Sequence, residues 1–258
     1  METGTPDLLL DRDGPVAFLT FNRPQARNAI TFEMYDALVR ACDQIEADAS
    51  LRVVIVRGAG GAFAAGTDIS QFRSFTTAAD ALGYEARFEK AVTRLEALQR
   101  PVIAAVRGDA VGGGAALLLA CDLRLCTPQS RFGIPIARTV GNCLSVANTA
   151  RLVAALGAAR TRALLFTGEL VGAADALAAG MINEITESVE DRAAALAARI
   201  AANAPLTVRV AKEAVRRVLA AQKPPPDDAL VLQAYLSEDF HEGVSAFLEK
   251  RKPQWKGR

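Results

Sequence analysis

The sequence has a single histidine, four cysteines and no long apolar run. Its longest apolar stretches, residues 115–120 and 153–156, are far too short to span a bilayer, so we expect no membrane segment. A Ser-His-Asp or Cys-His site would have to use His241, which lies in a charged C-terminal segment far from any nucleophile motif. Hydrolysis by such a triad, as in a protease, is therefore not expected.

The four cysteines are Cys42, Cys121, Cys126 and Cys143, and they form no CxxC pair. Because they also have no partnering histidines, we expect neither a bound metal nor a disulfide framework. Free buried thiols are typical of a cytoplasmic protein. Residues 1–7 contain no basic-then-apolar run, so no secretory signal is expected either.

Charge of neither sign dominates the chain. The formal net charge is +1, so no bulk field favours nucleic acid or an acidic membrane as a partner. Because 51% of the residues are hydrophobic, the composition is that of an ordinary globular protein. The length of 258 residues predicts one large domain, or one domain with a smaller appendage.

Strand and helix patterns alternate in the first part of the chain. Short apolar, β-branched runs predict strands over residues 16–21, 53–56, 102–106 and 123–126. Helical patterns lie over residues 31–47, 80–98, 112–120, 144–155 and 158–166. After Ile185 only helices are expected, over residues 188–203, 205–221 and 228–250, the last two separated by the proline-rich residues 223–226. The sequence thus predicts an α/β core followed by a helical C-terminal part.

Small residues surround Gly66 in the segment from Ala62 to Ile69, between a strand and a helix. Their size lets another molecule approach the backbone, and glycine can adopt a positive φ there. We expect Asp68 to cap the following helix by accepting from the amide of Gln71, with the Gln71 side chain reaching back.

A second glycine turn, Gly112-Gly113-Gly114, opens the helix after the strand over residues 102–106. Free amides at a helix start point outward, at the positive end of the helix dipole. Two such amides brought together form an oxyanion hole, worth about 3–4 kcal/mol per donor for a developing negative charge. A phosphate site or close helix–sheet packing remains an alternative for each turn. The GxGxxG motif is absent, so a dinucleotide site is not favoured.

Four segments together resemble the crotonase (enoyl-CoA hydratase/isomerase) family. They are the NRPxxxNA-like residues 22–29, the AFxAGxDI-like residues 62–69, the segment 106–122 with GGG and then LACDLR, which runs on to Arg124, and the FLEKRKP ending over 246–253. They occur in the family's order across the chain. The resemblance implies a spiral of ββα units over residues 1–195. It also implies a helical region over 196–258 for trimerisation and for covering the active site.

The resemblance further implies a bound acyl-CoA, with no cofactor beyond its CoA moiety, and a homotrimer or dimer of trimers. It assigns the oxyanion amides to Thr67 and Gly113. The residues it assigns to the CoA site are Arg23, Ala64, Gly66, Asp68 and Ile69, together with Lys252 and Trp255 of the C-terminal segment, which in the family often comes from a neighbouring subunit. Lys252 and Trp255 could instead be ordinary surface residues.

The sequence departs from the family pattern at two positions. Hydratases of the family carry a glutamate after the glycines and another in an FGxPE segment, and here these positions are Ala116 and Ile136. Adding water to a conjugated double bond needs one group to activate water and one to protonate the α-carbon. Neither alanine nor isoleucine can do so, and we do not expect two-glutamate hydration.

The loop over residues 138–145 is one place to look for replacement chemistry. Relatives with isomerase or dehalogenase activity place an aspartate in this region, and the nearest match here is Asn142, which can orient a substrate but cannot act as a base. Cys143 could ionise if it lay at a helix N-terminus. A helix cap formed by Asn142 or Ser145 is the competing interpretation.

Acidic residues offer other candidates. Asp109, three residues before the glycines, could be a pocket acid or a turn residue. Glu85 and Glu89 lie in the helix over 80–98 that in the family covers the acyl pocket, although a solvated helical face is the default interpretation. Asp68 and Asp122 are expected to be structural.

The leading hypothesis is an acyl-CoA lyase or isomerase in fatty-acid or related metabolism. Isomerisation, decarboxylation or C–C cleavage is favoured, because an enolate in an oxyanion hole supplies much of what each requires. Hydration by other residues and a non-catalytic CoA-binding subunit remain alternatives.

Overall fold

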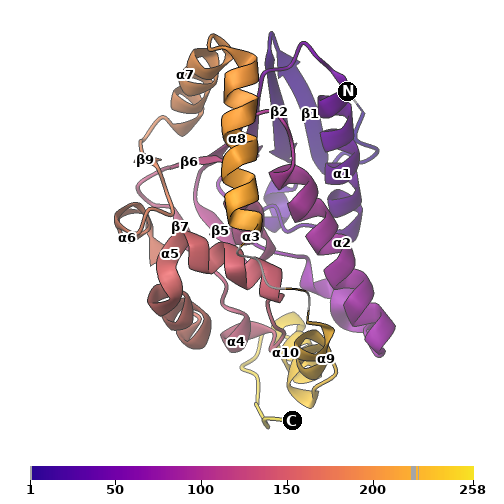
Figure 1. Ribbon diagram of the computed structural model, residues 1–258. Coiled ribbons are helices and arrows are strands. Elements are labelled where there is room, and N and C mark those ends of the chain that lie inside the picture. Colours follow the sequence, from indigo (N-terminus) through magenta and orange to yellow (C-terminus); the bar gives the residue numbers. More distant parts are fainter. Residues whose placement is uncertain (1, 222–224, 226) are drawn as a thin grey trace.

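A six-stranded sheet forms the centre of the protein, whose computed structural model describes residues 2–221, 225 and 227–258 (Figure 1). Three residues of the expected proline-rich break, 223, 224 and 226, lie outside the described residues. The sheet order is β1-β2-β3-β4-β6-β9, with β1 and β2 antiparallel and every other neighbouring pair parallel. The strands are β1 (Leu8–Asp13), β2 (Val16–Phe21), β3 (Val53–Gly58), β4 (Val102–Val106), β6 (Leu123–Cys126) and β9 (Glu184–Ile185).

The sheet is covered on both faces, which explains the continuous apolar runs of its central strands. Alternate residues of β3 face opposite sides: Val54 and Val56 join the main core, whereas Val53 and Ile55 join a second cluster. The main core includes residues of α1 (Phe32–Ala47), α2 (Ala78–Glu96) and α3 (Gly113–Leu119). The second cluster is closed by α7 (Val189–Ala201), which packs across the other face.

A smaller sheet of order β5-β7-β8 lies beside the large one. Its strands are β5 (Asp109–Val111), β7 (Arg131–Gly133) and β8 (Val171–Gly172). Each repeating unit has one strand in the large sheet, one strand in the small sheet and then a helix. The first such unit is β4-β5-α3, and the next begins with β6 and β7. The expected α/β spiral of ββα units is confirmed.

The helices α1 and α2 pack side by side, and each begins at a capping residue that the sequence supplies. Thr31 caps α1 by accepting from the amide of Met34. At the start of α2, Thr77 and Asp80 form a reciprocal capping box. Because the buried residues of α2 recur at helical spacing, one face of this helix is turned toward the core and toward the cavity described below.

The two helices expected over 144–155 and 158–166 are present as the two halves of α5 (Val146–Thr167). Gly157, with φ of 76° and ψ of 158°, interrupts its helical backbone, so the expected break is present as a kink. A short helix, α4 (Ile136–Thr139), precedes it and was not expected from the sequence.

The C-terminal part is helical from α7 onward, as expected. The expected division after residue 195 falls inside α7, so the segment outside the sheet layers begins with α8 (Pro205–Ala220). The single helix expected over 228–250 is two, α9 (Asp228–Tyr235) and α10 (Glu238–Leu248), because Ser237 caps a new helix. In Figure 1 these two helices lie beside α4 and the end of α2.

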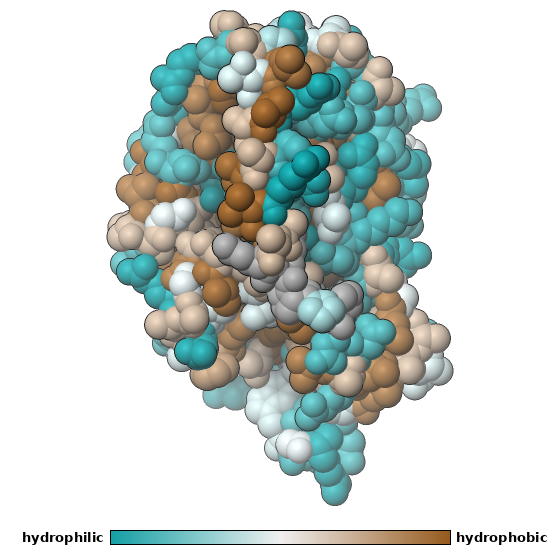
Figure 2. Space-filling model, in the orientation of Figure 1, coloured by the Kyte–Doolittle hydropathy of each residue, from teal (hydrophilic) through white to brown (hydrophobic). Residues whose placement is uncertain are grey.

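Helix α8 crosses the front of the molecule in Figure 1 and, along its whole described length, buries none of its residues. Its exposed apolar residues, visible as the brown strip in Figure 2, include Leu206, Val210 and Val218. None of the described helices is long and apolar enough to cross a membrane.

Candidate active site

The two glycine turns lie directly against each other. The amide of Val111 donates to the carbonyl oxygen of Ala64 at 2.9 Å, joining the strand before the second turn to the first turn. Gly66 has φ of 101°, and a Cβ added there would lie 3.2 Å from the carbonyl oxygen of Val111. A Cβ on Gly114 would overlap the carbonyl of Ala64. The glycines are therefore needed so that two backbone segments can meet.

The amides of Thr67 and Gly113 are unused, since no backbone carbonyl among the described residues accepts from either one. Both residues line a cavity of about 410 Å³. The side chain of Thr67 is held from two sides: its Oγ1 lies 2.8 Å from the hydroxyl of Tyr35 and 2.9 Å from that of Tyr84. These contacts fix the backbone of Thr67 at the cavity wall.

Asp68 is structural, but the expected partner was wrong. Its carboxylate accepts from the amide and hydroxyl of Ser70 and pairs with Arg23 at 3.1 Å. Gln71 instead accepts from the amide of Phe32, at the start of α1. The segment after Asp68 is a 3-10 helix, η2 (Ile69–Ser74), whose tighter turn brings residue i+2 rather than i+3 to the cap.

Two acidic residues line the cavity, Asp68 and Glu85. Asp68 is paired with Arg23, whereas Glu85 in α2 forms no ion pair within the described chain. The residue is 8% exposed, and its Oε1 accepts a 2.7 Å hydrogen bond from the hydroxyl of Tyr235 in α9. Its Oε2 is buried and has no partner in the described chain. Burial raises the pKa of Glu85 to about 7, although the Tyr235 hydrogen bond lowers it; the nearby charge of Glu89 also raises it. A carboxyl of this kind can take up and release a proton at neutral pH.

Asn142 also lines the cavity, in the loop between α4 and α5. Its Nδ2 donates to the hydroxyl of Tyr235 at 3.0 Å, while its Oδ1 is buried without a partner. The neighbouring Cys143 lines the cavity, but it does not lie at a helix start, because Ser145 caps α5. Burial raises the pKa of the Cys143 thiol to about 12, so the condition under which this thiol could ionise is not met.

Several residues expected at the site lie outside the cavity wall. Both carboxylate oxygens of Asp109 accept from Arg131, at 2.9 and 2.8 Å, so the structure does not bring this acid into the pocket. Arg23 pairs with Asp7 and Asp68, and Ala64 is buried between the two turns. Gly66, Asp68 and Ile69 do line the cavity.

The C-terminal residues Lys252 and Trp255 also lie outside the cavity wall and are exposed. The Trp255 ring nevertheless lies against Gly141, beside the loop that carries Asn142. Their expected contact with CoA stays a prediction. From the same part of the chain, Phe247 and Leu248 of α10 reach the cavity instead.

Ala116 and Ile136, which the sequence resemblance matched to the hydratase glutamates, offer no acid or base. Ala116 is buried in α3, and Ile136 lines the cavity at the start of α4. Glu85, the cavity-lining acid that is not tied up by an arginine, comes instead from α2.

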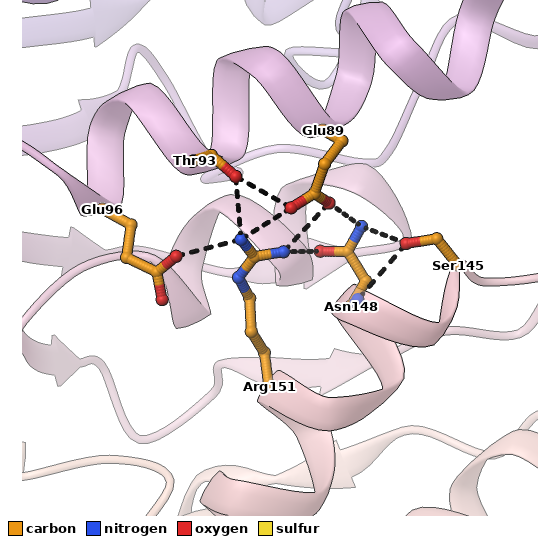
Figure 3. A network of polar contacts seen from close by, with 6 residues as sticks. All are labelled: Glu89, Thr93, Glu96, Ser145, Asn148 and Arg151. Carbon is orange, nitrogen blue, oxygen red and sulfur yellow. Dashed lines mark hydrogen bonds and ion pairs between the residues drawn. The ribbon is translucent and has the colours of Figure 1, made fainter. Parts of the chain in front are cut away.

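Glu89, the second candidate in α2, belongs to a separate polar cluster (Figure 3). Its two oxygens bind the guanidinium of Arg151 at 2.8 and 3.0 Å, and Glu96 pairs with the same group at 2.9 Å. Asn148 and Ser145 extend the cluster to the start of α5. The Arg151 side chain is only 4% exposed, whereas those of Glu89 and Glu96 are 32% and 18% exposed, so a buried guanidinium with partly exposed carboxylates clamps α2 to α5.

Tyr235 is the site residue that the sequence interpretation missed, and Glu85 was named only as one of two possibilities. A signal for Glu85 was present: it falls within the stripe formed by Ala81, Tyr84, Phe88 and Ala91, where a charge is out of place. Tyr235 lies 150 residues further along, and no local pattern connects the two.

Comparison with known proteins matches this chain to one family over nearly its whole length. The family model described as enoyl-CoA hydratase/isomerase matches residues 11–258. The short-chain-enoyl-CoA hydratase of Clostridium acetobutylicum is 33% identical over 255 residues, covering 95% of this chain and 96% of the relative.

Comparison with solved structures points to the same family. An enoyl-CoA hydratase/carnithine racemase from Magnetospirillum magneticum has a TM-score of 0.80 at 35% identity, covering 99% of this chain and 97% of the other. A methylmalonyl-CoA decarboxylase in complex with 2-nitronate-propionyl-CoA has a TM-score of 0.88 at 27% identity, covering 97% and 98%. Together with the two glycine turns and their position in the ββα spiral, these matches show that the chain belongs to the enoyl-CoA hydratase/isomerase family.

Proposed function

We propose that this protein is an enzyme that acts on an acyl-CoA thioester and receives its carbonyl oxygen between the amides of Thr67 and Gly113. Both amides lack an acceptor and both residues line the same cavity. Removal of a proton next to a thioester leaves negative charge on that oxygen. Two preorganised amides would stabilise the charge by about 3–4 kcal/mol each. The names of the relatives, which are enzymes of CoA esters, support the same substrate class.

The proton is carried by Glu85. The observation that supports this assignment is a buried, unpartnered carboxylate oxygen in the wall of the cavity that the two amides share. With a pKa of about 7, the carboxyl can take a proton from a substrate carbon and return it during one turnover. In this proposal Asp109 takes no part.

A single proton carrier beside an oxyanion hole suits some reactions better than others. In a double-bond shift, Glu85 takes the proton from one carbon, the electron pair moves onto the thioester oxygen, and the proton returns to another carbon. In C–C cleavage, the same carboxyl would protonate the enolate that remains. Decarboxylation is less favoured, because it would bring a second carboxylate beside Glu85. Two-glutamate hydration has no residues to perform it at Ala116 and Ile136.

The rest of the site follows the same proposal. Gly66, Asp68 and Ile69, which line the cavity, would contact the CoA arm, and the proposed reaction requires no cofactor beyond CoA. Lys252 and Trp255 would reach the CoA of a neighbouring subunit in a homotrimer or dimer of trimers. The unburied apolar residues of α8 support such an assembly, since it would remove them from water.

Exchange of α-protons tests the chemistry without knowledge of the natural substrate. Saturated acyl-CoAs are incubated with the protein in D₂O, and deuterium uptake is followed by mass spectrometry. We expect uptake by the wild type and a loss of about 10²- to 10⁴-fold in Glu85→Gln. The matched control is Asp109→Asn, which removes a carboxylate outside the cavity and should exchange normally.

Two other results would favour the alternatives. If crotonyl-CoA loses its conjugated absorbance at a rate that Glu85→Gln leaves unchanged, the protein is a hydratase that uses other residues. If acyl-CoA binds but no acyl-CoA exchanges or turns over, the protein is a non-catalytic CoA-binding subunit.

A further inference from the structure

The hydroxyl of Tyr35 in α1 contacts both residues whose amides the proposed function uses. Its oxygen lies 2.8 Å from Oγ1 of Thr67. It also lies against the main chain of Gly113, because a Cβ added to Gly113 would be only 2.5 Å from this oxygen. A single atom from α1 therefore contacts both turns, one residue further along each turn than Gly66 and Gly112.

The surroundings of Tyr35 leave it little room to move away. The residue is fully buried in the main core, and its ring packs on that of Phe88 with 5.4 Å between the ring centroids. The start of α1 is fixed by the Thr31 cap and by the hydrogen bond from the amide of Phe32 to Gln71. Side chains locked in this way can hold a site to within about 0.5 Å. The Tyr35 hydroxyl can thus act as a fixed spacer between the turns.

This spacer carries no charge at neutral pH. Burial raises the pKa of Tyr35 and that of Tyr84 above the usual value for tyrosine, so both hydroxyls stay protonated. The hydroxyls of Tyr35, Thr67 and Tyr84 are hydrogen-bonded to one another, and none is among the buried unpartnered atoms of the described chain. An anionic group here would repel the charge proposed to develop on the thioester oxygen, whereas a neutral hydroxyl does not.

We propose that Tyr35 is a positioning residue, whose hydroxyl sets the distance between the amides of Thr67 and Gly113. The inference rests on the proposed function, since it takes these two amides to hold the thioester oxygen. Their spacing matters most when negative charge develops on that oxygen, because preorganised donors stabilise the transition state more than the bound substrate. Tyr35 therefore affects the rate of enolate formation and leaves the binding of acyl-CoA nearly unchanged. Its role differs from that of Glu85, which carries the proton.

Tyr35→Phe tests the spacer, because it removes the hydroxyl and keeps the ring. Exchange of the α-protons of butanoyl-CoA in D₂O is measured between pH 5 and 9, and calorimetry gives the dissociation constant. We expect the plateau rate to fall roughly tenfold, since small displacements of groups in a site are costly to the rate. The dissociation constant should stay within about twofold of the wild-type value, and the midpoint of the pH profile should not move.

Gly113→Ala tests the contact itself. Its methyl group would overlap the Tyr35 hydroxyl, so the exchange rate should fall by about 100-fold. In Gly113→Ala/Tyr35→Phe the methyl group takes the space that the hydroxyl leaves, and about tenfold of the lost rate should return. Gly113→Ala/Tyr84→Phe is the matched control. It also removes a hydroxyl bonded to Thr67, but not one of the three atoms nearest to the added Cβ, and no rate should return.

Three results would overturn the inference. They are an unchanged plateau rate in Tyr35→Phe, a loss of rate that comes only from weaker binding or a shifted midpoint, and equal recovery in the two double variants. A wild type that exchanges no α-protons rejects the proposed function instead. An active wild type beside an equally active Tyr35→Phe rejects only the spacer. Urea unfolding of Gly113→Ala with and without Tyr35→Phe measures the contact independently of exchange, and equal stability of the two would reject it.

Discussion

The hydroxyl of Tyr235 in α9 donates a 2.7 Å hydrogen bond to the carboxylate of Glu85 in α2, 150 residues earlier in the chain. The C-terminal helices therefore do more than cover the cavity. They set the charge state of the carboxyl inside it, because a donor to the ionised form lowers its pKa against the effect of burial.

The rate of α-proton exchange should rise with pH and level off above a midpoint near 7. Glu85 must be ionised to take a proton, and its pKa is about 7. The profile of kcat/KM against pH measures the midpoint in the free enzyme. A profile that stays flat from pH 5 to 9 would reject Glu85 as the base.

Tyr235→Phe should move this midpoint upward by about one pH unit, because it removes a hydrogen bond that favours the ionised carboxylate. The same profile measures the shift. Tyr35→Phe is the matched control, since Tyr35 contacts Thr67 rather than Glu85 through its hydroxyl. An equal shift in both variants would point to general loosening of the site.

The stability of the protein should carry the opposite pH dependence from its activity. The pKa of Glu85 is about 7 in the folded chain and near its usual 4.5 in the unfolded one, so the folded state holds the proton more tightly. Its contribution is fully present below pH 4.5 and is lost as pH rises toward 7.

Between pH 4.5 and 8 the free energy of unfolding of the wild type should therefore fall relative to that of Glu85→Gln by about 3 kcal/mol. Urea unfolding of both proteins at several pH values gives this difference. Parallel curves for the two proteins would show that Glu85 titrates normally.

Arg151→Met should destabilise the protein by about 1–3 kcal/mol, because it leaves the partly exposed carboxylates of Glu89 and Glu96 facing each other without their buried counter-charge. The same change should raise the midpoint of the exchange profile, since Glu89 then acts on Glu85 without its counter-charge. Arg216→Met is the control: its partner Glu213 lies on the surface of α8, and neither measurement should change noticeably. Urea unfolding measures the change in stability, and the pH profile of exchange measures the shift of the midpoint.

Gly114→Ala should impair folding or exchange strongly, because its Cβ would overlap the carbonyl oxygen of Ala64. Gly83→Ala, in α2, meets nothing within 4 Å and should raise stability by up to about 1 kcal/mol through helix propensity. Thermal unfolding and α-proton exchange rates are measured for both variants. If the two variants behaved alike, the close approach of the two glycine turns would not be needed for folding or exchange.

Local signals in the sequence were sufficient for most of the fold. Thr31 and the apolar stripe behind it correctly predicted α1, and the β-branched run from Val53 predicted a strand buried on both faces. Errors occurred where a local signal was ambiguous. Asp68 opens a 3-10 helix instead of an α-helix, and Ser237, which looks like any polar residue inside a helix, caps a new one.

The site was less predictable because side chains distant in sequence decide it. Asp109 has the right position for a pocket acid, but Arg131 on the neighbouring strand holds both its oxygens. The pKa of Cys143 depends on burial that no local pattern reveals. Glu85 could be found as a charge in an apolar stripe, whereas its link to Tyr235 exists only once α9 has folded against α2.

The contact between Gly66 and Gly112 is made by main chain alone, with a Cβ added to Gly112 only 3.4 Å from the Cα of Gly66. No side chain separates the two turns at this contact, and Thr67 is held in addition by the hydroxyls of Tyr35 and Tyr84. In the function we propose, the groups that would distinguish one reaction from another, at Ile136, Glu85 and Asn142, lie in other elements, whereas Ala116 shares α3 with Gly113. Substitutions at those three positions would then change the chemistry while the two amides proposed to hold the thioester keep their spacing.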